Sequence, residues 1–381
     1  MDLSLSEDQL SVRAAFAEFF DKEATVERVR AAEPLGFDPD LWLKLAGTGA
    51  VAMGLPEEAG GGGASALDLV LVAEQYGRRL APVPFVESAV AGRLLAQAAI
   101  AGTGPDAAAT SSTGTAATTA TSSTGQSSLS DLIAGIADGS LLATIALAPA
   151  SGGRLRLVPA GAVAEVVLAL DGEDLIALRR APGARPHTEA SPNFGSSPLA
   201  DWPLSDGGQD GGQDGERDGE RIVLATGASA AQLYAGALAE WKLLTAAALG
   251  GLRSAALELG LAYIKARKAF GVIIGSFQAV QHRLADLAVA GDGGQLLTYE
   301  AAWARDSGEP GAAALASMAF LFAADCAFRT TRECLQFHGG YGFTLEYDIQ
   351  LYFRRAKAWQ LALGDPRREY ARLADLAYPE G

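Results

Sequence analysis

Two pieces of sequence near the C-terminal end decide the fold. The first is Arg267-Lys268-Ala269-Phe270-Gly271, followed by Phe277-Gln278, and the second is the run Gln-Phe-His-Gly-Gly-Tyr-Gly-Phe over 336–343. A guanidinium grips phosphate through paired, charge-assisted hydrogen bonds, and an aromatic ring three residues later can lie against a flat ring. Paired glycines let the backbone approach a ligand without a Cβ in the way. Both pieces suit a large, flat cofactor that carries a pyrophosphate.

Each piece also has a plainer interpretation. A helix that ends in Gly, as at Gly271, is what ordinary C-capping produces. Gly339-Gly340-Tyr341-Gly342 could form a common turn. Either piece alone is weak support for cofactor contact, so the interpretation rests on their order and separation.

Length, charge and composition limit the class of protein. A chain of 381 residues exceeds the usual single domain, so we expect two or three domains. The net charge of −15 argues against nucleic acid as a partner. No run approaches eighteen uninterrupted apolar residues and no secretory signal opens the chain, so we expect a cytoplasmic protein without a membrane span. Cys326 and Cys334 do not have a metal-ligand spacing, and we expect no metal site.

The pattern of residues 1–100 predicts an all-α N-terminal domain. Ser6-Glu7-Asp8-Gln9 is a capping box that opens the first helix, and the apolar period predicts further helices over 40–46, 67–76 and 86–99. Residues 101–130 are almost wholly Ala, Thr, Ser and Gly. They offer nothing large to bury, so we expect a low-complexity disordered insert.

Over 131–228 the pattern becomes that of strands and predicts a small middle β-domain. Expected strands cover 142–147, 154–158, 165–170, 174–178 and 221–224. Asp171-Gly172 marks a hairpin between two of them. The Gly, Gln and Asp repeats between them predict a disordered loop over 205–220, and Trp202 falls in a stretch with no strand pattern.

Residues 229–381 predict a C-terminal four-helix bundle with a short helical tail. The expected helices cover 238–263, 278–300, 312–337, 349–363 and 367–377. The predicted fold class is therefore mainly α, with a small central, barrel-like β-domain between an N-terminal helical domain and the bundle.

Taken together, the two pieces resemble the C-terminal domain of the acyl-CoA dehydrogenase family. The resemblance is specific from about Leu233 to Gln360, weaker over 1–98 and poor between 100 and 228. Members of that family use FAD to remove two hydrogens from the α and β carbons of an acyl-CoA thioester. The resemblance implies an FAD-dependent oxidoreductase acting on CH–CH groups, with an acyl-CoA substrate and an electron-transfer flavoprotein as its oxidant.

In this family the flavin lies across a subunit boundary. The bundle of one subunit holds the ADP half, and the β-domain of its neighbour holds the isoalloxazine ring. The resemblance implies that this chain contacts the ADP half through eight residues. They are Arg267, Phe270, Gln278, Gln336, Phe337, His338, Gly339 and Gly340.

Two other parts of the family's site are missing from the sequence. The Thr-rich, Gly-Ser loop and the Trp-x-Thr/Ser segment that hold the flavin ring have no counterpart, and Pro149-Ala150-Ser151-Gly152-Gly153 stands in place of the first. Most members carry a catalytic Glu on the last helix, where alignment without gaps places Leu363, with Asp365 two residues further on.

A few members carry the catalytic Glu on the first bundle helix instead. That register falls on Trp241, with Glu240 next to it and rotated by about 100° on a helix. Glu240 is therefore the candidate base, and its plainer interpretation is a solvated carboxylate on a helix face.

These losses favour a degenerate subunit that gives the ADP half of a flavin site to a competent acyl-CoA dehydrogenase subunit. The family contains such heterotetramers, some of which act in lipid or steroid catabolism. Two alternatives stay open. The chain is a self-sufficient homotetrameric enzyme that uses Glu240, or it is a flavin-free structural subunit.

Overall fold

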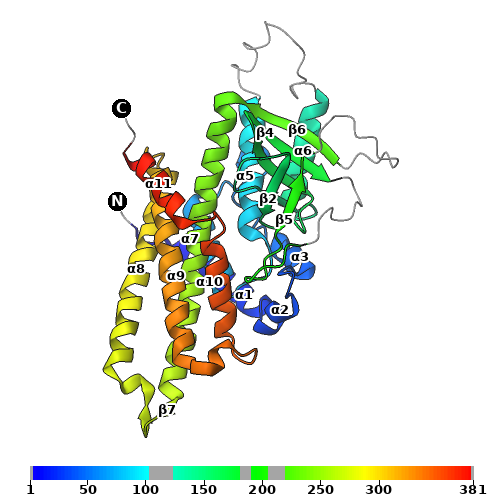
Figure 1. The fold of residues 1–381 in the computed structure, drawn as a ribbon. Helices are drawn as coiled ribbons and strands as arrows, with labels where there is room; N and C mark the ends of the chain where they lie inside the picture. Colours follow the sequence, from blue (N-terminus) through cyan, green and yellow to red (C-terminus); the bar gives the residue numbers. More distant parts are fainter. Residues whose placement is uncertain (1–2, 103–122, 181–189, 205–218, 379–381) are drawn as a thin grey trace.

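The structure is a computed structural model that describes residues 3–102, 123–180, 190–204 and 219–378. Figure 1 shows helices at the N-terminus, a small β-region at one end of the molecule, and long C-terminal helices that run away from it. This α–β–α order is the one predicted. The N-terminal elements are α1 (Glu7–Glu23), α2 (Val26–Ala31), α3 (Pro39–Gly47), η1 (Glu57–Ala59), α4 (Ala66–Arg78) and α5 (Phe85–Gly102).

The predicted capping box starts α1. The Ser6 side chain accepts a hydrogen bond from the Gln9 backbone N–H, and the Gln9 side chain accepts one from the Ser6 N–H. These two bonds satisfy N–H groups that a helix start otherwise leaves without partners. Helices α3, α4 and α5 lie where the apolar period placed them, whereas α2 was not predicted.

The end of the predicted insert 101–130 differs from the expectation. Residues 103–122 lie outside the described residues, but α6 (Ser123–Ala137) begins inside the stretch that we expected to be disordered. Leu129, Leu132 and Ile136 of this helix are buried in the main core. Sequence analysis missed this helix because its first half is rich in Ser and Thr and only its second half is apolar.

The β-region consists of two small sheets packed face to face. The larger has the order β1-β3-β4-β6, with a parallel first pair and antiparallel pairs after it, and the smaller is the antiparallel pair β2-β5. The predicted hairpin at Asp171 joins β3 to β4. The strands are β1 (Ala143–Ile145), β2 (Arg154–Val158), β3 (Val166–Asp171), β4 (Asp174–Arg180), β5 (Ala200–Pro203) and β6 (Gly219–Thr226).

The larger sheet is buried on both faces. Side chains of a strand alternate between faces, so Val166 and Leu168 pack into the helical core while Val167 and Ala169 pack against the smaller sheet. Trp202 belongs to that second core, on β5. The interpretation of its surroundings as irregular was wrong, because a four-residue strand with Pro at its end is too short to show a period. The expected loop 205–220 lies outside the described residues up to residue 218.

The C-terminal bundle contains the predicted helices and is dominated by one of 40 residues. The elements are α7 (Gly227–Ala266), β7 (Lys268–Ala269), β8 (Val272–Ile273), η3 (Ile274–Ser276), α8 (Gln278–Asp306), α9 (Ala312–His338), η4 (Gly339–Phe343), α10 (Ile349–Gln360) and α11 (Pro366–Ala377). Within the described residues, one stretch, Ala312–Phe343, is long and apolar enough to cross a membrane. Half of its apolar window is buried inside the fold, as in a core bundle helix.

Helices α4 and α7 pack with their backbones almost in contact. A Cβ at Gly77 would lie 1.9 Å from the Ala248 carbonyl oxygen, and a Cβ at Gly251 would lie 1.8 Å from the Glu74 carbonyl oxygen. No side chain fits at either position, so each helix requires a glycine where it crosses the other. This crossing joins the N-terminal domain to the bundle.

A buried carboxyl lies beside the crossing. Glu74 accepts hydrogen bonds from Gln295 Nε2 and from the Tyr299 hydroxyl, both at 3.2 Å and both on α8. Burial raises the pKa of Glu74 to about 7, although these two hydrogen bonds act in the opposite direction. Because the folded pKa lies above the unfolded value, ionising Glu74 costs folding free energy as the pH rises from about 4.5 to about 7, and the whole cost remains above that.

We therefore expect Glu74→Gln to stabilise the protein at pH 8 by roughly 2 to 3 kcal/mol, because it removes a buried charge and keeps a hydrogen-bonding amide. Urea unfolding at pH 8 and at pH 5 measures the difference. The gain should shrink towards zero at pH 5, where Glu74 is largely protonated in the folded protein.

The matched control is Glu258→Gln. Glu258 is an exposed carboxylate of α7 that forms an ion pair with Arg78 of α4. A surface ion pair contributes about 0 to 1 kcal/mol, so this variant should show little pH-dependent change. A Glu74→Gln effect that is the same at both pH values would contradict the assignment of the cost to ionisation.

Candidate functional site

The predicted ADP-binding residues lie together at the end of the bundle farthest from the sheet (Figure 1). Arg267 is the C-cap of α7, Phe270 lies in the β7–β8 turn, and Gln278 is the first residue of α8. Tyr263, on the last turn of α7, stacks on His338 at the end of α9, with the ring centroids 4.0 Å apart. This stack holds the two sequence pieces side by side.

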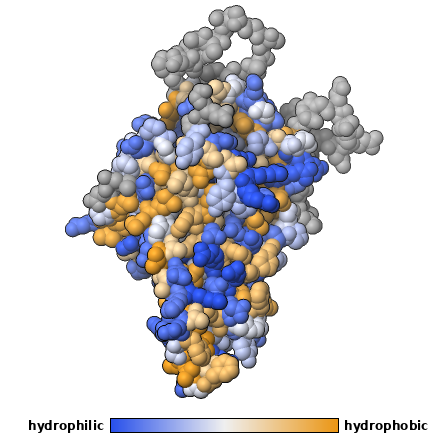
Figure 2. Space-filling view, turned by 60° about the vertical axis from the view of Figure 1, so that its left-hand side comes forward, coloured by the Kyte–Doolittle hydropathy of each residue, from blue (hydrophilic) through white to orange (hydrophobic). Residues whose placement is uncertain are grey.

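Phe270 is the most exposed large apolar residue of the described chain. Its side chain is 97% exposed, and its backbone has a φ of 54°, a region that residues other than Gly rarely occupy. An aromatic ring in water and a strained backbone both cost free energy, and such features are typical of binding sites. Figure 2 shows apolar side chains gathered around this narrow end of the molecule.

The remaining polar groups of this end face outward. Arg267 and Gln278 are exposed, and Arg267 makes no side-chain hydrogen bond or ion pair with the described residues. The first turn of α8 contains no acidic residue, and its N-cap, Phe277, provides no side-chain cap. The Val280 and Gln281 N–H groups donate to the Phe277 carbonyl oxygen, so the Gln278 and Ala279 N–H groups are the ones available for an anion, which the helix dipole favours there.

The second sequence piece contributes both exposed and buried residues. Gln336, Gly339 and Gly340 are exposed, Phe337 is half-buried, and a Cβ at either glycine would meet no neighbour. His338 differs from them, because it is buried under the Tyr263 ring and its Nδ1 donates to the Cys334 carbonyl oxygen at 2.7 Å. Burial lowers the pKa of His338, so its ring is neutral and supports the exposed glycines from below.

Glu240, the candidate base, is neither solvated nor open to a ligand. Its carboxylate is buried and forms ion pairs with Arg93 of α5, at 2.8 Å, and with Arg305 of α8. Trp241, one residue further on, instead lines a cavity between the N-terminal helices, the β-region and the bundle. The helical rotation of about 100° per residue thus separates the two, and the geometry gives Glu240 the role of a structural ion-pair residue.

The other position where the family carries a base also lacks one. Leu363 is apolar and packs at the edge of the core. Asp365 is the N-cap of α11, where its carboxylate accepts hydrogen bonds from Arg367, which lower its pKa. A capping carboxylate with a lowered pKa is a poor proton acceptor at neutral pH.

Two segments of the β-region stand where the resemblance places the flavin-ring contacts. Residues 149–153 end in an exposed turn in which Ser151 is bridged to Arg154. The Trp202 indole is buried, donates to the Gly161 carbonyl oxygen at 2.9 Å and has the Arg180 guanidinium over its face at 4.5 Å. The indole is therefore already engaged within the domain.

A cavity of about 270 Å³, called the junction cavity below, lies where all three parts of the molecule meet. Tyr76 and Glu87 come from the N-terminal helices, Pro159 and Ala160 from the β-region, and Arg355 with other residues from α10. The walls are mainly apolar and aromatic. Concave, apolar sites with few polar groups are typical of small-molecule binding.

Sequence reasoning assigned no role to the three charged residues that line this cavity from α5 and α10, which are Glu87, Arg355 and Lys357. Glu87 is the only acidic residue of α5, a signal that could have drawn attention to it. Arg355 follows Arg354 in sequence, and nothing local distinguishes the buried guanidinium from its neighbour. They reach the same cavity because α5 and α10 both pack against α7.

Comparison with known proteins identifies the family of the chain. Residues 6–109 match the profile of the acyl-CoA dehydrogenase N-terminal domain, and residues 231–371 match that of the C-terminal domain. The stretch between them, where the resemblance is poor, lies outside both matches. The acyl-CoA dehydrogenase IpdE2 of Mycolicibacterium smegmatis is 30% identical over 374 residues, which cover 97% of this chain and 98% of that protein.

Two solved structures are similar over the whole chain. The Tcur3481–Tcur3483 steroid ACAD has a TM-score of 0.76 at 26% identity, covering 98% of each chain. The ChsE4–ChsE5 complex from Mycobacterium tuberculosis has a TM-score of 0.76 at 26% identity, covering 100% of each chain. The chain belongs to the acyl-CoA dehydrogenase family of flavoprotein oxidoreductases.

We expect Glu240→Gln to lower the free energy of unfolding by about 3 kcal/mol, because it leaves two half-buried arginines without their shared, buried carboxylate. Chemical denaturation of the purified chain measures this loss. If a complex with a dehydrogenase partner is assembled, turnover per folded complex should stay within about twofold of the wild type.

The conservative control is Glu240→Asp, which keeps the charge and should recover part of the stability. A well-folded Glu240→Gln protein that lost activity more than a hundredfold would restore Glu240 as the base.

Proposed function

We propose that this chain is one subunit of a heteromeric acyl-CoA dehydrogenase, in which it holds the ADP half of an FAD shared with a second, competent subunit. The complex removes hydrogens from the α and β carbons of an acyl-CoA thioester. An electron-transfer flavoprotein reoxidises it, and we expect all three proteins in the cytoplasm.

The observation that carries this proposal is the distance between the two sites of the chain. The long helix α7 lines the cavity with Trp241 and ends at Arg267, about 39 Å away at the rise of 1.5 Å per residue of an α-helix. The ADP-binding residues therefore serve a site outside this chain's own cavity. A neighbouring subunit that covers the exposed end of the bundle would complete it.

The described residues fit one half of FAD. Arg267 and the α8 N-terminus suit a pyrophosphate, Phe270 offers a ring face, and Gly339 and Gly340 leave clearance for close approach. The 149–153 turn and the engaged Trp202 do not fit the flavin ring. FAD would supply the hydride acceptor of the reaction, and the ring would be held by the partner.

Proton abstraction also points to the partner. Abstracting the α-proton needs a carboxylate within hydrogen-bonding reach of that carbon. The two positions where the family carries this carboxylate hold Leu363 and Trp241 here. The base of the heteromer would therefore come from the second subunit.

The relatives suggest the class of substrate. One similar structure carries the description steroid ACAD, and both similar structures are named for two proteins. A heterotetramer that acts on the CoA thioester of a bulky ring compound in steroid catabolism is the form of the proposal that these relatives favour.

We expect Arg267→Ala to remove flavin from the assembled complex. Losing one charge-assisted contact to a phosphate costs about 1.5 to 3 kcal/mol, which weakens binding roughly 10- to 150-fold. The measurement is the visible flavin absorbance per mole of complex after gel filtration, compared with the wild type.

Arg368→Ala is the charge-matched control, because Arg368 is an exposed arginine of α11, far from the β7–β8 turn (Figure 1). It should leave flavin content unchanged. Equal flavin content in wild type and Arg267→Ala would favour the flavin-free structural subunit. About one FAD per chain in the protein purified alone would favour the homotetrameric enzyme.

Phe270 provides a second, independent test. Phe270→Gly removes both the ring and the backbone strain, so the flavin-free chain should be at least as stable as the wild type while the complex binds FAD more weakly, by roughly tenfold. Phe270→Ala removes the ring but keeps the strained φ. Comparing thermal unfolding and flavin dissociation for the two variants separates the contribution of the ring from that of the backbone. Unchanged FAD affinity in both would exclude Phe270 from the site.

A further inference from the structure

The polar groups of the junction cavity differ in how well they are satisfied. Asn193 donates to the Ser191 and Ser197 carbonyl oxygens and accepts from two backbone N–H groups, so its amide is fully used. Lys357 donates to Gln360 and lies over the Phe328 ring. Two charged side chains of the lining are left, Arg355 and Glu87.

Arg355 is a buried guanidinium with few protein partners. It is 6% exposed, and among the described residues it makes one long hydrogen bond, from Nη2 to the Ser196 carbonyl oxygen at 3.4 Å, and no ion pair. The Arg355 guanidinium carbon also lies over the Trp359 ring, 5.7 Å from its centroid. A guanidinium has five N–H donors and stays charged, so its burial leaves donors to be satisfied from the cavity.

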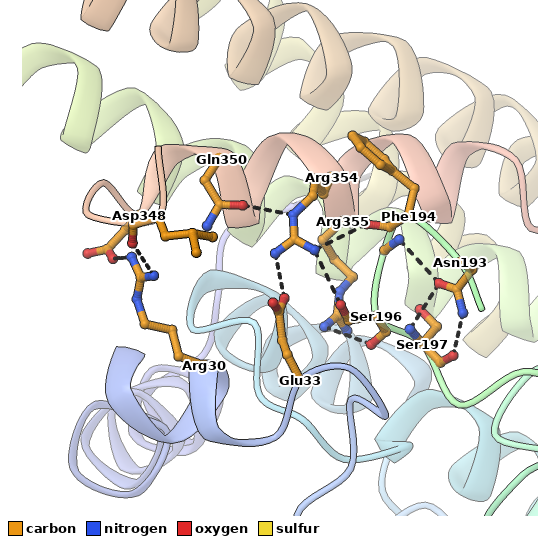
Figure 3. Close-up of polar contacts among 12 residues, drawn as sticks. Arg30, Glu33, Asn193, Phe194, Ser196, Ser197, Asp348, Gln350, Arg354 and Arg355 are labelled. Carbon is orange, nitrogen blue, oxygen red and sulfur yellow. Dashed lines mark hydrogen bonds and ion pairs between the residues drawn. The ribbon is translucent and has the colours of Figure 1, made fainter. Parts of the chain in front are cut away.

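The adjacent Arg354 has many partners, so the lack of partners is specific to Arg355 and its place in the cavity lining. Figure 3 shows the two adjacent guanidiniums of α10 in different surroundings. Arg354 is saturated by Glu33 at 2.6 Å, Gln350 at 2.8 Å and the Ser196 hydroxyl at 3.3 Å. Arg355 reaches only the backbone of the same loop and lines the cavity.

Glu87 faces the same cavity from α5. Burial raises its pKa, and this outweighs the opposite effects of the Trp241 indole and of Arg355. No ion pair joins Glu87 to Arg355 within the described residues. The Arg355 guanidinium therefore presents hydrogen-bond donors to a cavity whose lining is otherwise mainly apolar.

We propose that the junction cavity binds an acyl group that is largely apolar but carries an oxygen acceptor away from the thioester, and that Arg355 recognises this oxygen. The thioester part of this inference rests on the proposed function. The recognition of an oxygen follows from the cavity itself. A volume of about 270 Å³ suits an acyl group with one or two rings.

The test is calorimetric binding of three CoA thioesters to the full-length chain: 3-cyclohexylpropanoyl-CoA and its 4-oxo and 4-carboxy analogues. We expect at least one oxygenated analogue to bind roughly tenfold or more tightly than the unsubstituted thioester, the gain expected from one charge-assisted hydrogen bond. The better of the two tells whether a ketone or a carboxylate is the preferred acceptor. Equal affinities for all three, or no binding of any, would overturn the proposal.

Three variants locate the effect. Arg355→Met keeps the length of the side chain and should abolish the preference, and thermal unfolding of the variant checks that the fold is intact. Arg354→Met removes the neighbouring cation and should keep the preference. Glu87→Gln changes the other charged side chain left in the lining and should keep most of the preference. A preference that survives Arg355→Met would overturn the role of Arg355.

Failure of this inference and failure of the proposed function are distinguishable. Binding to the cavity is measured on the chain alone and needs no flavin. If the complex loses FAD in Arg267→Ala but the three thioesters bind equally, only the oxygen recognition falls. If the oxygenated thioester is preferred but no complex retains FAD, the cavity assignment stands and the shared flavin site falls.

Discussion

The close contact between α4 and α7 is the constraint on which the rest of the structure depends. Gly77 and Gly251 each face the backbone of the other helix at a distance that excludes any side chain. Because interiors are close-packed, an added Cβ at either position would push the helices apart. Tyr76, next to Gly77, lines the cavity, so the same contact that joins the N-terminal domain to the bundle also sets one wall of the binding site.

Helix α7 also fixes the positions of the other helices. Two of its charged residues are buried, and each is paired with residues of other helices. Glu240 is paired with arginines of α5 and α8, and Lys242 is paired with Glu369 of α11 and donates to Ser317 of α9. Buried pairs add little net stability but are costly to break, so they fix which helices lie against α7. The helix therefore extends from the junction cavity to the exposed end of the bundle around Phe270. These two places are too far apart for one ligand to occupy both.

The two ends of the molecule have opposite physical character. The cavity has mainly apolar walls and is lined by the buried Arg355 guanidinium. The exposed end of the bundle is strained at Phe270, and it presents Arg267 and an uncapped helix start to solvent. The cavity has walls from three parts of the chain, whereas the exposed end has no opposite wall within the described residues. This asymmetry supports the proposal that the chain shares a cofactor with a neighbouring subunit.

Local patterns were sufficient for most of the elements. The Ser6 capping box, the Asp171 hairpin and the helical period of the bundle predicted structure correctly, because each depends on residues close in sequence. The helix after Ser123 and the strand around Trp202 were missed, since low-complexity sequence and a four-residue strand give almost no period. The Arg267 and Gly339 pieces were recognisable because the family's motifs have fixed residue types at fixed spacing.

The sequence by itself determined the order of helices and strands, the family and the pieces that suit an ADP group, all of which follow from short-range spacing. Only the tertiary structure decided which charges face a ligand. Glu240 and Trp241 are neighbours in sequence, as are Arg354 and Arg355, yet within each pair one side chain is engaged by the protein and the other lines the cavity. A rotation of about 100° per residue separates neighbours on a helix, and what each then meets depends on helices distant in sequence.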